Sequence, residues 1–216
     1  MFRLLVGLLG VTSVIVAVSL LFGGGSLLWL DTALTDAQGF INTVPMEMGV
    51  DGYALVAGSA EIGIEPELPI DVGELATIRL RAENQSASQA IFLGVAETDA
   101  LDAYLGGVAY AVIDEMGEDS FEFSYRTNET GEAPPAPPTV DIWVTSAYGV
   151  GEQVIEWEIS SGDFSFVVMN EAATEGMEFE VVVGARVPLI KSVGVSLLVG
   201  GGVALALGTI LLAIAL

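Results

Sequence analysis

The chain has 216 residues, a formal net charge of −23, no cysteine and no histidine. All 29 acidic side chains lie between Asp31 and Glu180, and so acidic a surface repels nucleic acid and anionic lipid headgroups. Without cysteine there are no disulfides and no thiolate metal sites, and without histidine the usual general base is missing. We therefore expect a non-enzymatic protein that does not bind nucleic acid.

The N-terminal segment has the character of a membrane anchor. An uncharged run from Leu4 to Leu30 follows Arg3, and it is longer than the apolar core of about 7–15 residues found in cleavable signal peptides. We therefore expect residues 1–30 to form an uncleaved transmembrane anchor.

A second uncharged run reaches from Ser192 to Leu216. It is long enough to cross a hydrocarbon core of about 30 Å and predicts a C-terminal transmembrane helix over residues 191–216. Small residues recur at helical spacing in both runs and favour an antiparallel helix pair. These small residues are Ser13 and Ala17 in the first run and Gly200, Ala204 and Gly208 in the second.

The basic residues favour one orientation in the cell membrane. Arg3 and the free amino group predict a cytoplasmic N-terminus, which places both termini in the cytoplasm and residues 31–190 outside the cell. Arg186 and Lys191 at the outer end of the second run favour the opposite orientation. Loops longer than about 60 residues largely escape the charge rule, so we keep the middle segment outside.

Residues 31–190 have mostly strand-like periodicity. Apolar and polar residues alternate in seven to nine short runs, which predicts a mainly β fold, an antiparallel jelly-roll-like sandwich. The runs Ile155–Ile159 and Phe164–Val168 are separated by a short loop containing Gly162, so we expect a β-hairpin there. The segment Thr98–Met116 has helical periodicity instead and predicts one amphipathic helix that covers a sheet.

Several segments resemble a known kind of protein. These are GVAETDALDAYLGGVAYAVID, the connector PPAPP, IWVTSAYGVGEQVIEWEISSGDFSFVVMN and the closing VVVGARVP. They are similar to an uncharacterised family of prokaryotic two-span membrane proteins, and the resemblance covers roughly Ile91 to the C-terminus. It implies an N-terminal helix, a β-rich extracytoplasmic domain and a C-terminal helix in this order. It implies no activity, ligand or catalytic residue.

Four acidic residues that follow the predicted helix form a candidate cation site. They are Asp114, Glu115, Glu118 and Asp119. Carboxylate oxygens suit Ca²⁺, which is the one cofactor that the sequence suggests. The alternative is a solvated acidic loop, because the spacing is not that of an EF-hand.

Three further residues are candidates for modification or binding. Asn84 and Asn128 each begin a glycosylation sequon in a predicted turn. Trp143 lies on the opposite parity to Ile142 and Val144, so we expect it to face outward or toward a partner. Trp157 lies on the apolar parity of its strand, and we expect it in the core.

The lysine-poor acidic surface is typical of proteins from high-salt habitats, and an acidic envelope protein from an ordinary habitat is the alternative. Two anchors around one domain favour a structural or accessory interaction module of the cell envelope, with the lipid bilayer and a membrane or envelope protein, or a second copy, as partners. The alternative is a ligand- or cation-sensing ectodomain coupled to the transmembrane helix pair.

Overall fold

The computed structural model describes residues 2–58, 76–116, 121–126 and 133–216, with the backbone alone at 114–116 and 121–126. The chain divides into two compact units, one of Met1–Ile41 with Arg186–Leu216 and one of Asn42–Ala185. Its helices are α1 (Phe2–Leu34), α2 (Thr98–Leu105), a short 3-10 helix (Pro137–Thr139) and α3 (Pro188–Ala215). Its strands are β1 (Ile41–Asn42), β2 (Met46–Val50), β3 (Ala54–Gly58), β4 (Thr77–Asn84), β5 (Ile91–Glu97), β6 (Tyr110–Met116), β7 (Phe121–Arg126), β8 (Trp143–Gly149), β9 (Gln153–Glu158), β10 (Phe164–Asn170) and β11 (Met177–Arg186).

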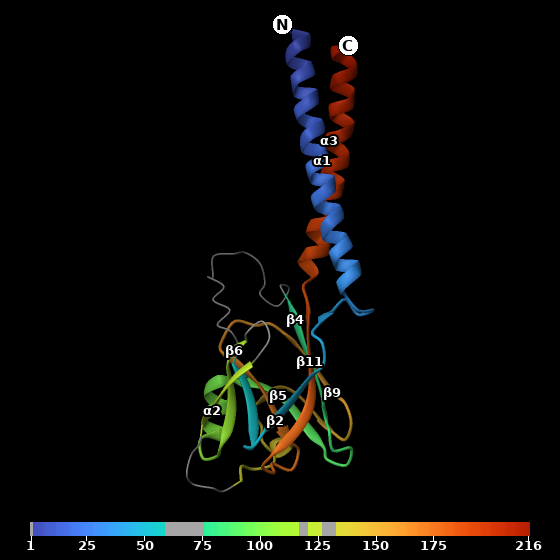
Figure 1. Ribbon diagram of the computed structural model, residues 1–216. Coiled ribbons are helices and arrows are strands. Elements are labelled where there is room, and N and C mark those ends of the chain that lie inside the picture. Colours follow the sequence, from blue (N-terminus) through green and yellow to red (C-terminus); the bar gives the residue numbers. More distant parts are fainter. Residues whose placement is uncertain (1, 59–75, 117–120, 127–132) are drawn as a thin grey trace. The chain divides into compact units, whose positions relative to one another are not determined.

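The first unit is a pair of long apolar helices. Helix α1 has 33 residues and α3 has 28, and both are long and apolar enough to cross a membrane. They lie side by side and antiparallel, so that the two termini of the chain meet at one end of the pair (Figure 1). The predicted packing of the two terminal helices against each other is confirmed.

The described residues of the second unit form two β-sheets, the first of which begins at Ile41. One has five strands in the order β1-β11-β4-β9, with β2 also paired to β11, and the other has six in the order β7-β6-β3-β10-β5-β8. The sandwich-like architecture between two terminal helices is therefore confirmed. Over the whole chain helix makes up 40% and strand 35%, so the mainly β description applies to the segment between α1 and α3 and not to the chain as a whole.

The prediction of a purely antiparallel, jelly-roll-like sandwich is wrong at one strand pair. Strands β3 and β6 run parallel, with Leu55 opposite Ala111 and Ala57 opposite Ile113. Strand β6 follows β5 in the chain and runs parallel to it, and the connection through α2 crosses β10 and β3 and places β6 beyond β3. The sheet is therefore mixed.

The predicted helix over Thr98–Met116 is too long. Helix α2 ends at Leu105, and Tyr110–Met116 continues as strand β6. The two glycines Gly106 and Gly107 follow the last helical residue, where they weaken continuation of the helix. Val108 and Val112, which extend the apolar stripe in the sequence, belong to the loop and the strand.

The predicted hairpin between Ile155 and Val168 is also wrong, although both strands exist. Strand β9 pairs with β4, whereas β10 pairs with β3 and β5 in the other sheet. The loop containing Gly162 therefore carries the chain from one sheet to the other. Trp157 contacts Phe164 and Phe166 across the core, with ring centroids 5.2 and 5.6 Å apart.

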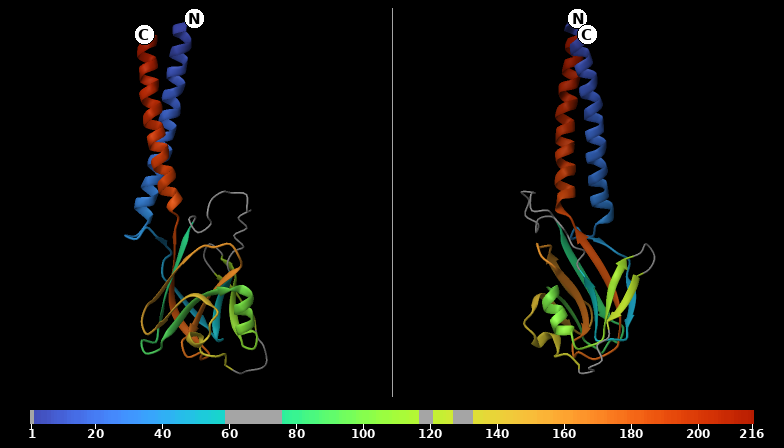
Figure 2. Two further views of the ribbon diagram at one scale, coloured as in Figure 1. Left: turned by 180° about the vertical axis from the view of Figure 1, so that it is seen from behind. Right: turned by 90° about the vertical axis from the view of Figure 1, so that its left-hand side faces the viewer.

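The central strands β3, β5 and β10 of the six-stranded sheet are largely buried on both faces. One face packs on the five-stranded sheet through a core that includes Leu93, Phe179 and Trp157, whose 6% exposure confirms its predicted core position. The other face packs on α2 through a second cluster that includes Phe92 and Leu101. Strand β5 contributes to both clusters, which explains its continuous apolar sequence, and Figure 2 shows α2 against this sheet.

Candidate functional site

The interface between α1 and α3 is built from small residues seven positions apart. On each helix the three buried residues repeat at this interval: Gly10, Ala17 and Gly24 on α1, and Gly194, Gly201 and Gly208 on α3. A seven-residue repeat keeps one seam of a helix facing its neighbour over its whole length. Small residues along such a seam let two backbones approach closely.

The backbones touch at these positions. A Cβ atom added to Gly24 would lie 2.7 Å from the carbonyl oxygen of Gly194, and one added to Gly201 would lie 3.1 Å from that of Ala17. The Ser13 hydroxyl also donates to the carbonyl of Ala204 across the interface, at 2.8 Å. A larger side chain at Gly24 therefore cannot fit without moving the helices apart.

The sequence prediction found part of this interface. It identified Ala17 and Gly208, which are buried, and Ser13, which bonds across the interface. Gly200 is exposed, and its added Cβ would come no closer than 4.0 Å to Leu20. Small residues four positions apart do not include Gly10 and Gly24 of α1 or Gly194 and Gly201 of α3. A repeat of seven residues includes all four.

The rest of the helix surface is apolar and exposed. Large side chains such as Leu5, Phe22, Val203 and Ile210 are each more than half exposed. Side chains of this kind prefer hydrocarbon to water, and no ionisable side chain interrupts α1 between Leu4 and Leu30. This surface has the chemistry of a lipid-facing one.

A compact turn follows α1 at the end of the helix pair away from the termini. The Asp36 carboxylate accepts hydrogen bonds from the backbone amides of Gln38 and Phe40, both at 2.9 Å. The Phe40 side chain is fully buried, and the Arg186 guanidinium carbon lies 4.7 Å from the centre of its ring. This cation–π contact links the segment after α1 to the segment before α3. The sequence analysis used Arg186 only as a charge and missed Phe40.

The candidate cation residues lie mostly outside what the structure describes. Asp114 and Glu115 belong to strand β6, whose side chains there are outside the described set, and Glu118 and Asp119 lie outside the described residues altogether. Among the described side chains, no three acidic residues are grouped so that they could hold a metal ion. The cation site stays a prediction.

The two glycosylation candidates have different outcomes. Asn128 lies outside the described residues. Asn84 is 4% exposed at the end of β4, where its Nδ2 donates to Oδ1 of Asn170 at 3.2 Å and its Oδ1 accepts from the Ser86 amide at 2.8 Å. The nitrogen that would carry a glycan is therefore inside the folded domain.

Trp143 lies against its own domain. Its indole Nε1 donates to the Pro137 carbonyl at 2.8 Å, and its ring centre lies 4.8 Å from that of Phe92 and 5.8 Å from that of Tyr104. The side chain is half-buried beside the cluster under α2. The bulge between Val95 and Ala96 shifts the register of β8, so the simple parity argument from the sequence does not hold there.

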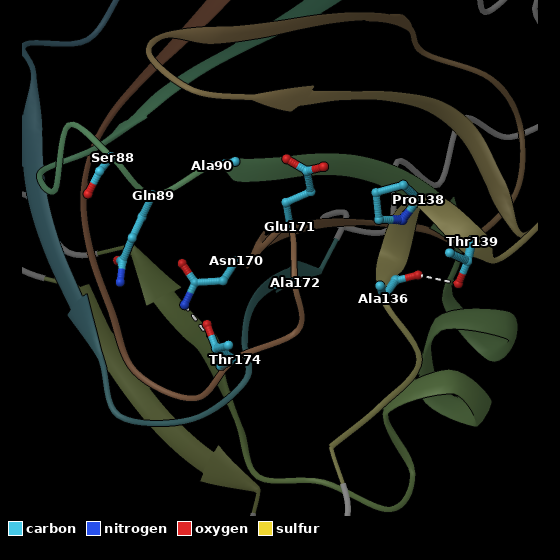
Figure 3. A pocket seen from close by; sticks show the side chains of 10 residues that line it. All are labelled: Ser88, Gln89, Ala90, Ala136, Pro138, Thr139, Asn170, Glu171, Ala172 and Thr174. Carbon is cyan, nitrogen blue, oxygen red and sulfur yellow. Dashed lines mark hydrogen bonds between the residues drawn. The ribbon is translucent and has the colours of Figure 1, made fainter.

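A cleft of about 580 Å³ opens at the end of β10 (Figure 3). Gln89 and Asn170 project from one wall, Pro138 and Thr139 form the other, and Glu171 lies between them. The described residues of the lining are Ser88, Gln89, Ala90, Ala136, Pro138, Thr139, Asn170, Glu171, Ala172 and Thr174. Among the described residues of this lining Glu171 is the one that carries a charge, and its carboxylate suits a small neutral or cationic group better than an anion.

Asn170 fixes one wall of the cleft. Its side chain is 3% exposed, and its Nδ2 donates to the carbonyls of Thr174 and Gly176 at 3.1 and 2.8 Å. With the bond from Asn84, these contacts satisfy a buried amide that would otherwise be costly. The sequence analysis gave Asn170 no role, because its partners are on a different strand and in a following loop.

The outer face of the five-stranded sheet carries charges in rows. On β4, Arg79 lies directly opposite Glu156 of β9, and its Nη2 donates to the Asn42 side chain at 2.9 Å. On the same face, between two other strands of this sheet, Glu180 of β11 lies directly opposite Glu47 of β2. Like charges opposite each other on neighbouring strands are destabilising, and salt screens them.

No protein-family model matches this sequence, and no curated protein matches it either. The resemblance to a family of two-span membrane proteins therefore identifies no family for this chain. The arrangement itself is shown: two long apolar helices flank a β-sheet domain.

Proposed function

We propose that this protein is a non-enzymatic, membrane-anchored envelope protein that presents an acidic β-sandwich outside the cell as a structural or accessory interaction module. The observation that carries the proposal is the interlocked helix pair. Six small residues in two seven-residue repeats bring the backbones of α1 and α3 into contact. A pair built in this way forms a permanent two-span anchor rather than a single flexible tether.

The proposed topology follows from the helix pair and the charge distribution. Because the helices are antiparallel, both termini lie on the same side of a membrane that α1 and α3 cross. Arg3 favours the cytoplasm for that side, so residues 35–187 lie outside. Protease added to intact cells should digest this segment, and protection of the segment would contradict the topology.

The interaction role is tested by purification from native membranes. A tagged full-length chain, extracted in a mild detergent, should bring down a stoichiometric envelope protein or a second copy of itself. The control is the same tag on an unrelated two-span protein of the same membrane. Recovery of a lone monomer under conditions that preserve other membrane complexes would contradict an accessory role.

The cleft supports a second candidate, a ligand-sensing ectodomain. Its walls are held by the Asn84–Asn170 bond, and Glu171 offers one carboxylate to a cationic group. Saturable binding of a small amine that Glu171→Gln weakens would favour this candidate over the structural module. Equal weak binding by the wild type and by Glu171→Gln would argue against it.

A further inference from the structure

Strand β8 forms an edge of the six-stranded sheet. It pairs with β5 on one side, and among the described residues no strand pairs with its other side. Alternate residues of an antiparallel strand direct their backbone N–H and C=O groups away from the neighbour, so this side offers unpaired groups to another strand. Proteins commonly protect such an edge with charged residues.

This edge carries no charge. The ten residues from Ile142 to Gly151 contain no Asp, Glu, Lys or Arg, in a chain that has 29 acidic residues. By contrast β9, which forms an edge of the five-stranded sheet, carries Glu156 and Glu158, both exposed. Strand β8 is therefore a place where two copies of a strongly acidic protein can meet without opposing carboxylates.

The exposed side chains of β8 are of the kind that pair across strands. Tyr148 is 52% exposed and Val144 is 54% exposed, and Ser146 between them is exposed as well. Tyr148 and Ser146 lie opposite Phe92 and Gly94 of β5, and the Tyr148 ring stacks on that of Phe92 at 6.3 Å. They therefore project from the Phe92 face of the sheet and stay exposed at its edge.

The sequence of β8 is complementary to itself in the antiparallel direction. If two copies pair about a two-fold axis at Ser146, Thr145 of each copy lies opposite Ala147 of the other, and Val144, where the bulge of β8 against β5 begins, lies opposite Tyr148. Aromatic residues opposite β-branched residues are favourable cross-strand pairs. In this register the flanking Asp141 and Glu152 lie opposite uncharged residues, so no two carboxylates face each other.

We propose that β8 pairs with β8 of a second copy of this chain, joining two six-stranded sheets into one continuous sheet. This inference rests on the proposed function, since it names the partner of the interaction module. Anchoring both copies in the same membrane raises their effective concentration and so favours pairing through a short strand. The two-fold axis makes the contact self-limiting at two copies.

Single cysteines test the register directly, because the chain has none of its own. In the full-length protein in native membranes, Ser146→Cys should form a disulfide-linked dimer about tenfold faster than a control, because the two thiols lie opposite each other. The matched control is Val154→Cys, at a residue that is 42% exposed and lies on β9. Equal rates for the two variants would overturn the proposal.

Charge substitutions distinguish a second copy from another partner. In the Ser146 register, Ser146→Lys places two positive charges opposite each other and Ser146→Glu two negative ones, so each variant alone should lose the dimer. Co-expression of the two variants should restore it, whereas the corresponding pair at Val154 should have no effect. Failure of the mixture to restore the dimer would overturn pairing at Ser146.

These outcomes are separable from the test of the proposed function. One outcome is that an envelope protein co-purifies in stoichiometric amount, and Ser146→Cys either forms no dimer or is crosslinked to that other protein. This result overturns pairing between copies but leaves the accessory role intact. A lone monomer with no Ser146 crosslink overturns both.

Discussion

Substitution of Gly24 by alanine probes the contact between α1 and α3 most directly. The added Cβ would lie 2.7 Å from the Gly194 carbonyl oxygen, and an ordinary contact requires at least 3.4 Å. Because the backbone fixes the position of the added Cβ and the carbonyl oxygen is itself a backbone atom, no side-chain rotation relieves the overlap. The helices must separate locally by roughly 0.7 Å, and the atoms packed along the interface then lose part of their dispersion attraction.

Overpacking of this kind costs about 1–3 kcal/mol. At 1.4 kcal/mol per factor of ten, the equilibrium for helix separation should shift by about 5- to 140-fold toward the separated state. Gly25→Ala is the matched control, because no atom lies within 4 Å of its added Cβ. Both substitutions raise helix propensity by the same amount, about 1 kcal/mol, so their difference isolates the packing.

Energy transfer between dyes measures the separation. The dyes are attached to Phe2→Cys and Leu216→Cys, which lie at the adjacent ends of the two helices and are 76% and 96% exposed. The full-length protein in mild micelles is titrated with a denaturing detergent. Gly24→Ala should separate at a lower detergent fraction than Gly25→Ala. Coincident curves would refute the close backbone contact.

Three further predictions concern the β-sheet domain. Trp157→Ala should lower the free energy of unfolding by about 3–5 kcal/mol, measured by chemical denaturation, because a large buried ring is lost. The control Val154→Ala, at an exposed residue of the same strand, should change the free energy of unfolding by no more than about 0.5 kcal/mol. Glu180→Gln should raise the melting temperature in 0.1 M KCl and have a smaller effect in 2 M KCl (test concentrations), because it removes the repulsion from Glu47 that salt screens; an equal gain at both concentrations would contradict this cause. Burial raises the pKa of Tyr104 from 10.0 to about 12, so the folded state keeps a proton that the unfolded state releases, and stability should fall as the pH rises from 10.0 to about 12. Tyr104→Phe should flatten this decline, and an unchanged slope in alkaline unfolding would contradict the assignment.

The sequence alone determined the elements whose signal is local. Two uncharged runs long enough to cross a membrane predicted α1 and α3, because length and apolarity are properties of a continuous segment. Alternation of apolar and polar residues predicted most strands, and it placed Trp157 correctly in the core. The repeat of small residues at the helix interface is also present in the sequence, at a spacing of seven residues.

Tertiary structure decided which elements meet. The pattern of β9 and β10 is the same whether they form a hairpin or lie in facing sheets, because alternation fixes which side of a strand is apolar and says nothing of its neighbour. In the same way, the apolar stripe from Leu101 to Val112 fits a long helix, but Gly106 and Gly107 end it and β6 gains its hydrogen bonds from β3. The buried pair of Asn84 and Asn170 joins residues 86 positions apart. Contacts of that kind depend on strand order, which no local pattern encodes.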